Sequence, residues 1–151
     1  MNSTISDSFG QRVSAGLAVL RIVLGVVFIA HGAQKLFVMG LAGTTAFFTQ
    51  AGIPLPAVTA PLVAVLEFFG GMALILGLFT RLAALGLAIN MLGAIVLVRA
   101  SGGFFAPQGA EFEITLCAAS VALALTGAGA FSLDAMLARR RSVAGTSAPT
   151  V

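Results

Sequence analysis

Four long runs of apolar residues take up most of this chain of 151 residues. They span roughly residues 15–38, 57–79, 82–98 and 112–130. A helix needs about 20 apolar residues to cross the hydrocarbon core of a bilayer. In lipid, a helix is favoured because it satisfies its own backbone hydrogen bonds. The runs therefore predict an all-α integral membrane protein, built as a four-helix bundle without a soluble domain.

The scarcity of charge indicates the same class of protein. Only 9% of the residues are charged, against about 25% in a typical soluble domain, and the mean hydropathy is +1.09. The net charge of +3 does not point to nucleic acid as a partner. So few basic residues are better explained as determinants of membrane topology, and the lipid bilayer is the expected partner.

The basic residues outside the apolar runs predict the orientation of the chain. Arg12, Arg81 and Arg139–Arg141 lie on one side, and Lys35 and Arg99 on the other. Since cytoplasmic loops carry an excess of Lys and Arg, both termini are expected in the cytoplasm. The chain is accordingly divided into a cytoplasmic segment at 1–14, a four-helix membrane domain at 15–138 and a basic, disordered cytoplasmic tail at 139–151.

Two short helices are expected outside the four spans. In the loop between the first two runs, Thr44 or Thr45 is suited to start a helix and Gly52 to stop it. This predicts a short amphipathic helix on the outer surface of the bilayer. After the fourth run, Ser132 can cap a short cytoplasmic helix that carries Asp134 in its first turn.

Ionisable residues inside the apolar runs mark the candidate site. The first run holds Arg21, His31 and Lys35, and Glu67 is the only acidic residue in the middle of another run. A charged side chain in the bilayer costs roughly 2.5–3.5 kcal/mol even on lenient scales, so these residues should face partners or water. Helical spacing places Arg21 and Lys35 on one stripe, with His31 at its edge. Either Arg21 or His31 is expected to pair with Glu67, and the spacing does not choose between them.

Two interpretations of these residues follow. In the first, ion pairs only orient the helices, and the members of this structural set are Arg21, Glu67, Arg81 and Asp134. In the second, polar residues line a pocket in the outer half of the membrane that binds a small molecule or relays protons. The members of this pocket set are His31, Lys35, Glu67 and Glu113.

The residue inventory restricts the redox chemistry of the chain. His31 is the only histidine, so a haem with two axial histidines from this chain cannot form. No spacing supports a metal site. Cys117 is the only cysteine, which excludes an intrachain disulfide and a CxxC thiol relay. A buried, unreactive thiol is expected there.

Seven short motifs follow one another along the chain. They begin at Leu20, Gly52, Glu67, Gly77, Gly103, Glu111 and Leu125. In order and spacing they resemble the DoxX family of small bacterial inner-membrane proteins, from about residue 15 to residue 137. The family pattern usually has proline where Ala128 stands here.

The resemblance implies a bacterial inner-membrane four-helix bundle, some of whose relatives are associated with quinone-linked sulfur oxidation or with thiol and oxidative-stress complexes. The expected function is a membrane subunit of such a redox complex, with a quinone or another small hydrophobic molecule in the polar pocket. Electron transfer would then need a bound quinone or a redox partner protein, so the chain is expected to be at most an oxidoreductase-complex subunit without a conventional redox centre of its own. The alternatives are a non-catalytic scaffold or chaperone-like partner, and a small transporter that would need a homo-oligomer to enclose a pathway.

Overall fold

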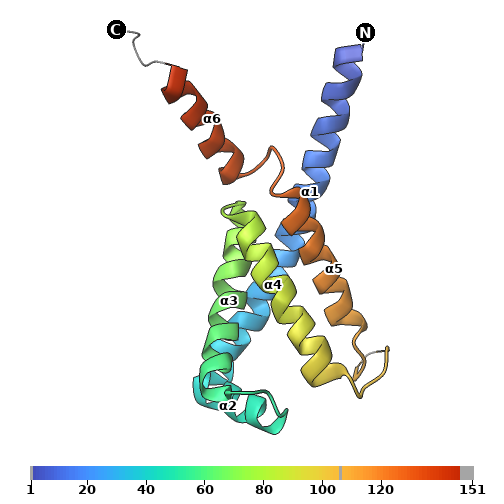
Figure 1. The fold of residues 1–151 in the computed structure, drawn as a ribbon, viewed down its shortest axis with the longest axis vertical. Coiled ribbons are helices and arrows are strands. Elements are labelled where there is room, and N and C mark those ends of the chain that lie inside the picture. The colour runs from blue at the N-terminus through green and yellow to red at the C-terminus, as the bar shows by residue number, and fades with distance from the viewer. Residues whose placement is uncertain (1, 106, 147–151) are drawn as a thin grey trace.

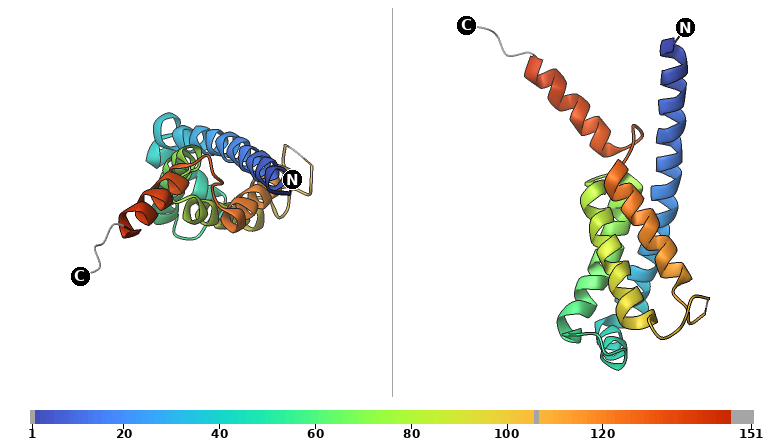
Figure 2. Two further views of the ribbon diagram at one scale, coloured as in Figure 1. Left: turned by 90° about the horizontal axis from the view of Figure 1, so that it is seen from above. Right: turned by 45° about the vertical axis from the view of Figure 1, so that its right-hand side comes forward.

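The computed structural model describes residues 2–105 and 107–146, which form six α-helices and two π-helical turns and contain no strand. In chain order these are α1 (Asn2–Ala33), η1 (Gln34–Val38), α2 (Gly40–Gln50), α3 (Pro56–Leu76), α4 (Thr80–Ala94), η2 (Ile95–Arg99), α5 (Glu111–Thr126) and α6 (Leu133–Thr146). Helices α1, α3, α4 and α5 pack alongside one another, and α2 lies at one end of them (Figure 1). The first part of α1 and helix α6 project from the opposite end (Figure 2). The all-α prediction is confirmed.

Three stretches are long and apolar enough to cross a membrane. They are Ser8–Val38, Pro56–Leu76 and Thr80–Arg99, and they correspond to the first three predicted runs. The fourth run forms α5, which has 16 residues and a length of about 24 Å at 1.5 Å per residue. This is less than the thickness of the hydrocarbon core, about 30 Å. Three spans are therefore supported by length and composition, and a fourth crossing by α5 stays a prediction.

Glycines bring α1 and α3 into close contact. A Cβ atom added at Gly32 would lie 2.5 Å from the backbone nitrogen of Phe68, and one added at Gly25 would lie 2.6 Å from the carbonyl oxygen of Gly71. Small residues allow helix backbones to approach in lipid, where packing rather than hydrophobic burial holds helices together. This approach brings the end of α1 next to Glu67 of α3.

An apolar core fills the space between the packed helices. Its buried members include Leu24, Phe28, Leu74, Leu87 and Leu123. They come from α1, α3, α4 and α5, so all four helices share a single core. The polar residues described below lie at the two ends of this core.

Arg21 joins three segments at the end of the bundle from which α6 projects. Its guanidinium donates to the carbonyl oxygens of Leu74 (3.0 Å) and Ile75 (2.8 Å), and to that of Phe131. The last carbonyl groups of a helix have no partner within it and favour a cation. Arg21 therefore binds the end of α3, and the pairing with Glu67 offered for it by the sequence is wrong.

Asp134 caps α4 from outside that helix. Its carboxylate accepts hydrogen bonds from the backbone N–H groups of Phe79 (2.8 Å) and Thr80 (3.0 Å). These donors have no partner within α4, and a carboxylate at a helix start is favourable. Arg81, grouped with Asp134 by the sequence, is exposed at the start of α4. The hydroxyl oxygen of Ser132 accepts a backbone N–H of the first turn of α6 at 3.1 Å, which confirms the predicted cap.

Three helix boundaries differ from the prediction. Helix α1 begins at Asn2 rather than at residue 15, because no proline interrupts the backbone hydrogen bonds before the apolar run. Helix α2 begins at Gly40 rather than at Thr44. Helix α6 continues to Thr146, so the first part of the tail predicted to be disordered is helical, consistent with the good helix propensity of arginine. Residues 147–151 of that tail lie outside the described residues.

Candidate small-molecule pocket

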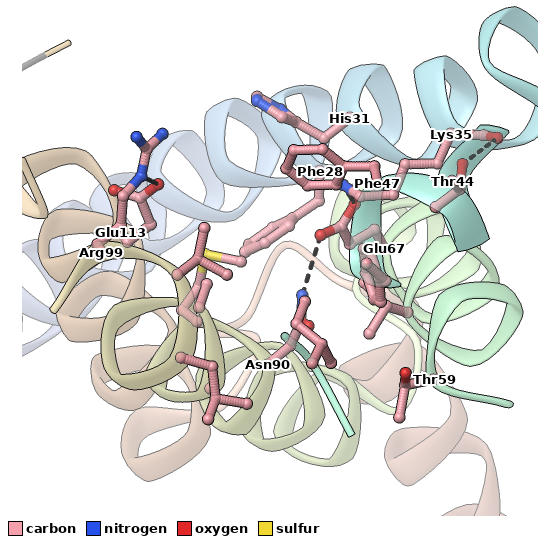
Figure 3. A pocket seen from close by; sticks show the side chains of 18 of the residues that line it. Phe28, His31, Lys35, Thr44, Phe47, Thr59, Glu67, Asn90, Arg99 and Glu113 are labelled. Carbon is pink, nitrogen blue, oxygen red and sulfur yellow. Dashed lines mark hydrogen bonds and ion pairs between the residues drawn. The ribbon is translucent and has the colours of Figure 1, made fainter. Parts of the chain in front are cut away.

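A cavity of about 550 Å³ lies at the end of the bundle where α2 packs. All the packed helices, α2 and both π turns contribute to its wall (Figure 3). Its polar lining residues are His31, Gln34, Lys35, Thr44, Thr59, Glu67, Asn90, Arg99 and Glu113. Its aromatic lining residues are Phe28, Phe47, Phe48 and Phe112. An apolar wall with a few converging polar groups is typical of a ligand site.

Glu67 is the centre of the first polar group. Its Oε2 accepts a hydrogen bond from Lys35 Nζ at 2.5 Å, and its Oε1 accepts one from Asn90 Nδ2 at 3.0 Å. Only 4% of the Glu67 side chain is exposed, against 18% of the Lys35 side chain. The ion pair and the amide together satisfy both oxygens of this buried carboxylate. Figure 3 shows the three side chains converging from η1, α3 and α4.

Arg99 and Glu113 form a second ion pair in the cavity wall. Arg99 Nε donates to Glu113 Oε1 at 2.8 Å, and Arg99 Nη1 donates to the carbonyl oxygen of Pro107 at 3.1 Å. The Arg99 side chain is 33% exposed and that of Glu113 11%. The other oxygen, Glu113 Oε2, is buried and has no hydrogen-bond partner. One of the two carboxylates in the cavity wall is thus fully satisfied, and the other is half satisfied.

His31 is exposed and lies at the edge of the cavity. Its ring centroid is 5.8 Å from that of Phe112. Its Nδ1 lies 2.9 Å from the carbonyl oxygen of Val27, and because a carbonyl can only accept, Nδ1 carries the proton in this contact. In the neutral ring, Nε2 is then an acceptor.

The two cations of the cavity both come from π-helical turns. Lys35 belongs to η1, where Met39 N donates to the carbonyl oxygen of Gln34 five residues earlier at 2.8 Å, and Arg99 belongs to η2. The carbonyl oxygen of Lys35 accepts instead from the hydroxyl of Thr44 at 3.0 Å. Turns of this kind are rare and occur frequently at functional sites. Thr44 therefore lies inside α2 and does not cap it, because its hydroxyl donates to a carbonyl oxygen of η1.

All four residues of the predicted pocket set line this cavity. The sequence offered Arg21 or His31 as the partner of Glu67, and the structure provides Lys35 in their place. Asn90 and Arg99 were not predicted as site residues. Asn90 could have been found, because it is the only polar side chain within the third apolar run.

Neither the thiol nor the acidic residues form a metal site in the described part of the chain. No group of three His, Cys, Asp or Glu side chains there could hold a metal ion. Cys117 is half-buried, and its thiol donates to the carbonyl oxygen of Ala88 at 3.6 Å. The arrangement can therefore bind and orient a molecule through hydrogen bonds, ion pairs and aromatic contacts.

Comparison with known proteins gives several relatives. A model of the DoxX family matches residues 16–100. A Bacillus subtilis protein named "Putative oxidoreductase CatD" is 34% identical over 88% of this chain and 95% of its own. An uncharacterised membrane protein of Mycobacterium tuberculosis is 34% identical over 83% of both chains. The inner membrane protein YphA of Escherichia coli is 31% identical over 89% of this chain and 99% of its own. No solved structure matches the chain.

Proposed function

The chain belongs to the DoxX family of membrane proteins, and we propose that it binds a quinone-like small molecule in the cavity between His31, Lys35, Glu67 and Glu113. In this proposal the protein is an inner-membrane subunit of a redox complex. Helices α1, α3, α4 and α5 all cross the bilayer, and both termini lie in the cytoplasm. Residues 15–138 form the membrane domain.

The observation that carries the proposal is the composition of the cavity wall. Its volume of about 550 Å³ lies within the range of small-molecule sites, about 300–1,000 Å³. A quinone ring needs donors for its carbonyl oxygens and apolar contacts for its faces. Lys35 Nζ and the Asn90 amide provide donors, and Phe28 and Phe112 provide aromatic surface. The residues present therefore fit the group that the family resemblance implies.

The other redox components of such a complex belong to a partner protein. When bound, a quinone supplies the capacity to accept two electrons together with protons. One histidine and one cysteine do not make a haem or dithiol centre. This protein would then hold and orient the ring, and the partner would exchange electrons with it. The oxidoreductase description in the name of the Bacillus subtilis relative agrees with such a role.

The test is direct binding of a short-chain quinone to the purified full chain in lipid nanodiscs. The wild type should bind, and His31→Leu should stay folded while its affinity falls about threefold or more, because the aromatic surface that His31 forms with Phe112 at the edge of the cavity is lost. Val65→Leu is the matched control, because Val65 is exposed on α3 and does not line the cavity. Equal affinity of wild type and His31→Leu would remove His31 from the site. No binding by the wild type would favour the scaffold instead.

A further inference from the structure

The two carboxylates of the cavity differ in what they can still bind. Glu67 accepts from Lys35 on one oxygen and from Asn90 on the other. Glu113 accepts from Arg99 through Oε1 alone, and its Oε2 is buried without a donor. A buried acceptor without a partner destabilises the folded protein, and more so when the group is charged. Native proteins therefore satisfy nearly all such atoms with protein, water or ligand.

Two of the donors near Glu113 are engaged with backbone carbonyl oxygens. Arg99 Nη1 donates to the carbonyl oxygen of Pro107 at 3.1 Å. The thiol of Cys117, one turn further along α5, donates to the carbonyl oxygen of Ala88 at 3.6 Å. Glu113 lines the cavity, and the last torsion of a glutamate side chain rotates easily. A donor that enters the cavity can therefore reach Oε2 after a small rotation of the carboxylate.

We propose that this donor is a ring hydroxyl of the ligand, so that the pocket selects the reduced, hydroquinone form over the quinone. The inference rests on the proposed function, because it concerns the ligand of the same cavity. A quinone offers only acceptors and cannot satisfy Glu113 Oε2, whereas a hydroquinone carries two O–H donors. A hydrogen bond from a hydroxyl to a carboxylate is charge-assisted and stronger than one between neutral groups.

His31, at the end of α1, also favours the hydroquinone over the quinone. Since its Nδ1 donates to the carbonyl oxygen of Val27, its Nε2 is an acceptor in the neutral ring. Phe112, which directly precedes Glu113 in α5, has its ring centroid 5.8 Å from that of His31. His31 and Glu113 are thus two acceptors in the cavity wall, and Lys35 is a donor.

The test compares the affinities of one short-chain ring in its two forms. The wild-type protein in nanodiscs is titrated anaerobically with the quinone and, separately, with the chemically reduced hydroquinone. The hydroquinone should bind about tenfold more tightly or better, as expected for one hydrogen bond to a charged acceptor. Such a preference raises the reduction potential of the bound pair by about 30 mV per factor of ten for two electrons. This potential is a second readout that needs no variant.

A variant assigns the preference to Glu113. In Glu113→Gln the charge is lost while the size is kept, so the hydroquinone preference should fall at least about threefold. Glu111→Gln is the matched control, two residues earlier in α5 and outside the cavity wall, and it should keep the preference. A wild type that binds both forms equally, or the quinone more tightly, overturns the inference and leaves the proposed function standing. If Glu113→Gln keeps the preference for the hydroquinone, the ligand hydroxyl does not bind Glu113 Oε2. That result also overturns the inference. Binding of neither form refutes the proposed function itself.

Discussion

Replacing Lys35 with methionine should destabilise the protein more than replacing its partner Glu67 with methionine. The two side chains form one ion pair, with 2.5 Å between Nζ and Oε2. Their surroundings differ, because 4% of the Glu67 side chain is exposed against 18% of the Lys35 side chain. Each substitution therefore leaves a different group behind.

The size of the two effects follows from what remains. In Lys35→Met, a buried carboxylate keeps only the hydrogen bond from Asn90 Nδ2, and removing one partner of a buried pair costs about 3–5 kcal/mol. In Glu67→Met, the ammonium group of Lys35 can turn to water along its flexible stem. The loss is then that of hydrogen bonds, about 1–3 kcal/mol. The two variants should differ by about 2 kcal/mol in their free energies of unfolding.

The double variant Lys35→Met/Glu67→Met should be more stable than Lys35→Met alone. Replacing both members of a buried ion pair by apolar groups of similar size is often nearly neutral. Only the Asn90 amide then lacks its acceptor, at a cost of about 1–2 kcal/mol. The coupling energy between the two positions should therefore reach about 2 kcal/mol or more.

Reversible unfolding in mixed detergent micelles, followed by circular dichroism, measures these free energies of unfolding. Val65→Met is the matched control, because Val65 is 44% exposed on the same helix as Glu67, and it should change stability by less than about 0.5 kcal/mol. The reasoning is refuted if Glu67→Met is as harmful as Lys35→Met, or if the double variant loses the sum of the two single losses. Equal losses would mean that the Lys35 ammonium group does not reach water, and additive losses would mean that the two charges need no partner.

Three other predictions concern packing, capping and topology. Gly32→Ala should cost about 1–3 kcal/mol, because its Cβ would lie 2.5 Å from the Phe68 nitrogen, while Gly16→Ala, which meets nothing within 4 Å, should keep or slightly raise thermal stability, since alanine is the better helix former. Asp134→Ala should cost about 0.5–2 kcal/mol and speed hydrogen exchange of the first amides of α4. If Asp134 did not cap α4, the substitution would leave that exchange unchanged. Reporter fusions at the two ends of the chain should be active only in their cytoplasmic forms, and an external C-terminus would reverse the proposed orientation.

The helical class and the membrane setting follow from the sequence alone. Both depend on local properties, namely the length and apolarity of each run and the need of every backbone group in lipid for a partner. The same reasoning singled out His31, Lys35, Glu67 and Glu113, since ionisable residues in apolar runs must converge on one another or on water. All four line one cavity.

Helix lengths were less predictable. The start of α1 at Asn2 and the extension of α6 to Thr146 lie in polar segments, where no change of hydropathy marks the helix boundary. The short α5 shows the converse, because its apolar run continues beyond the 16 residues that are helical. The helix ends before Gly127, whose φ of +83° stops it while the sequence stays apolar.

The pairing of the charges was decided only by the tertiary structure. Helical spacing gives the face and approximate depth of a side chain, but not the rotation of a helix or its distance from a neighbour. Gly25, Gly32 and Gly71 set that distance for α1 and α3. The π turns add a residue to the helical repeat, which turns every later side chain by about 100° relative to a regular helix. In the packed structure the carboxylate of Glu67 meets Lys35 and Asn90, whereas Arg21 binds the far end of the same helix.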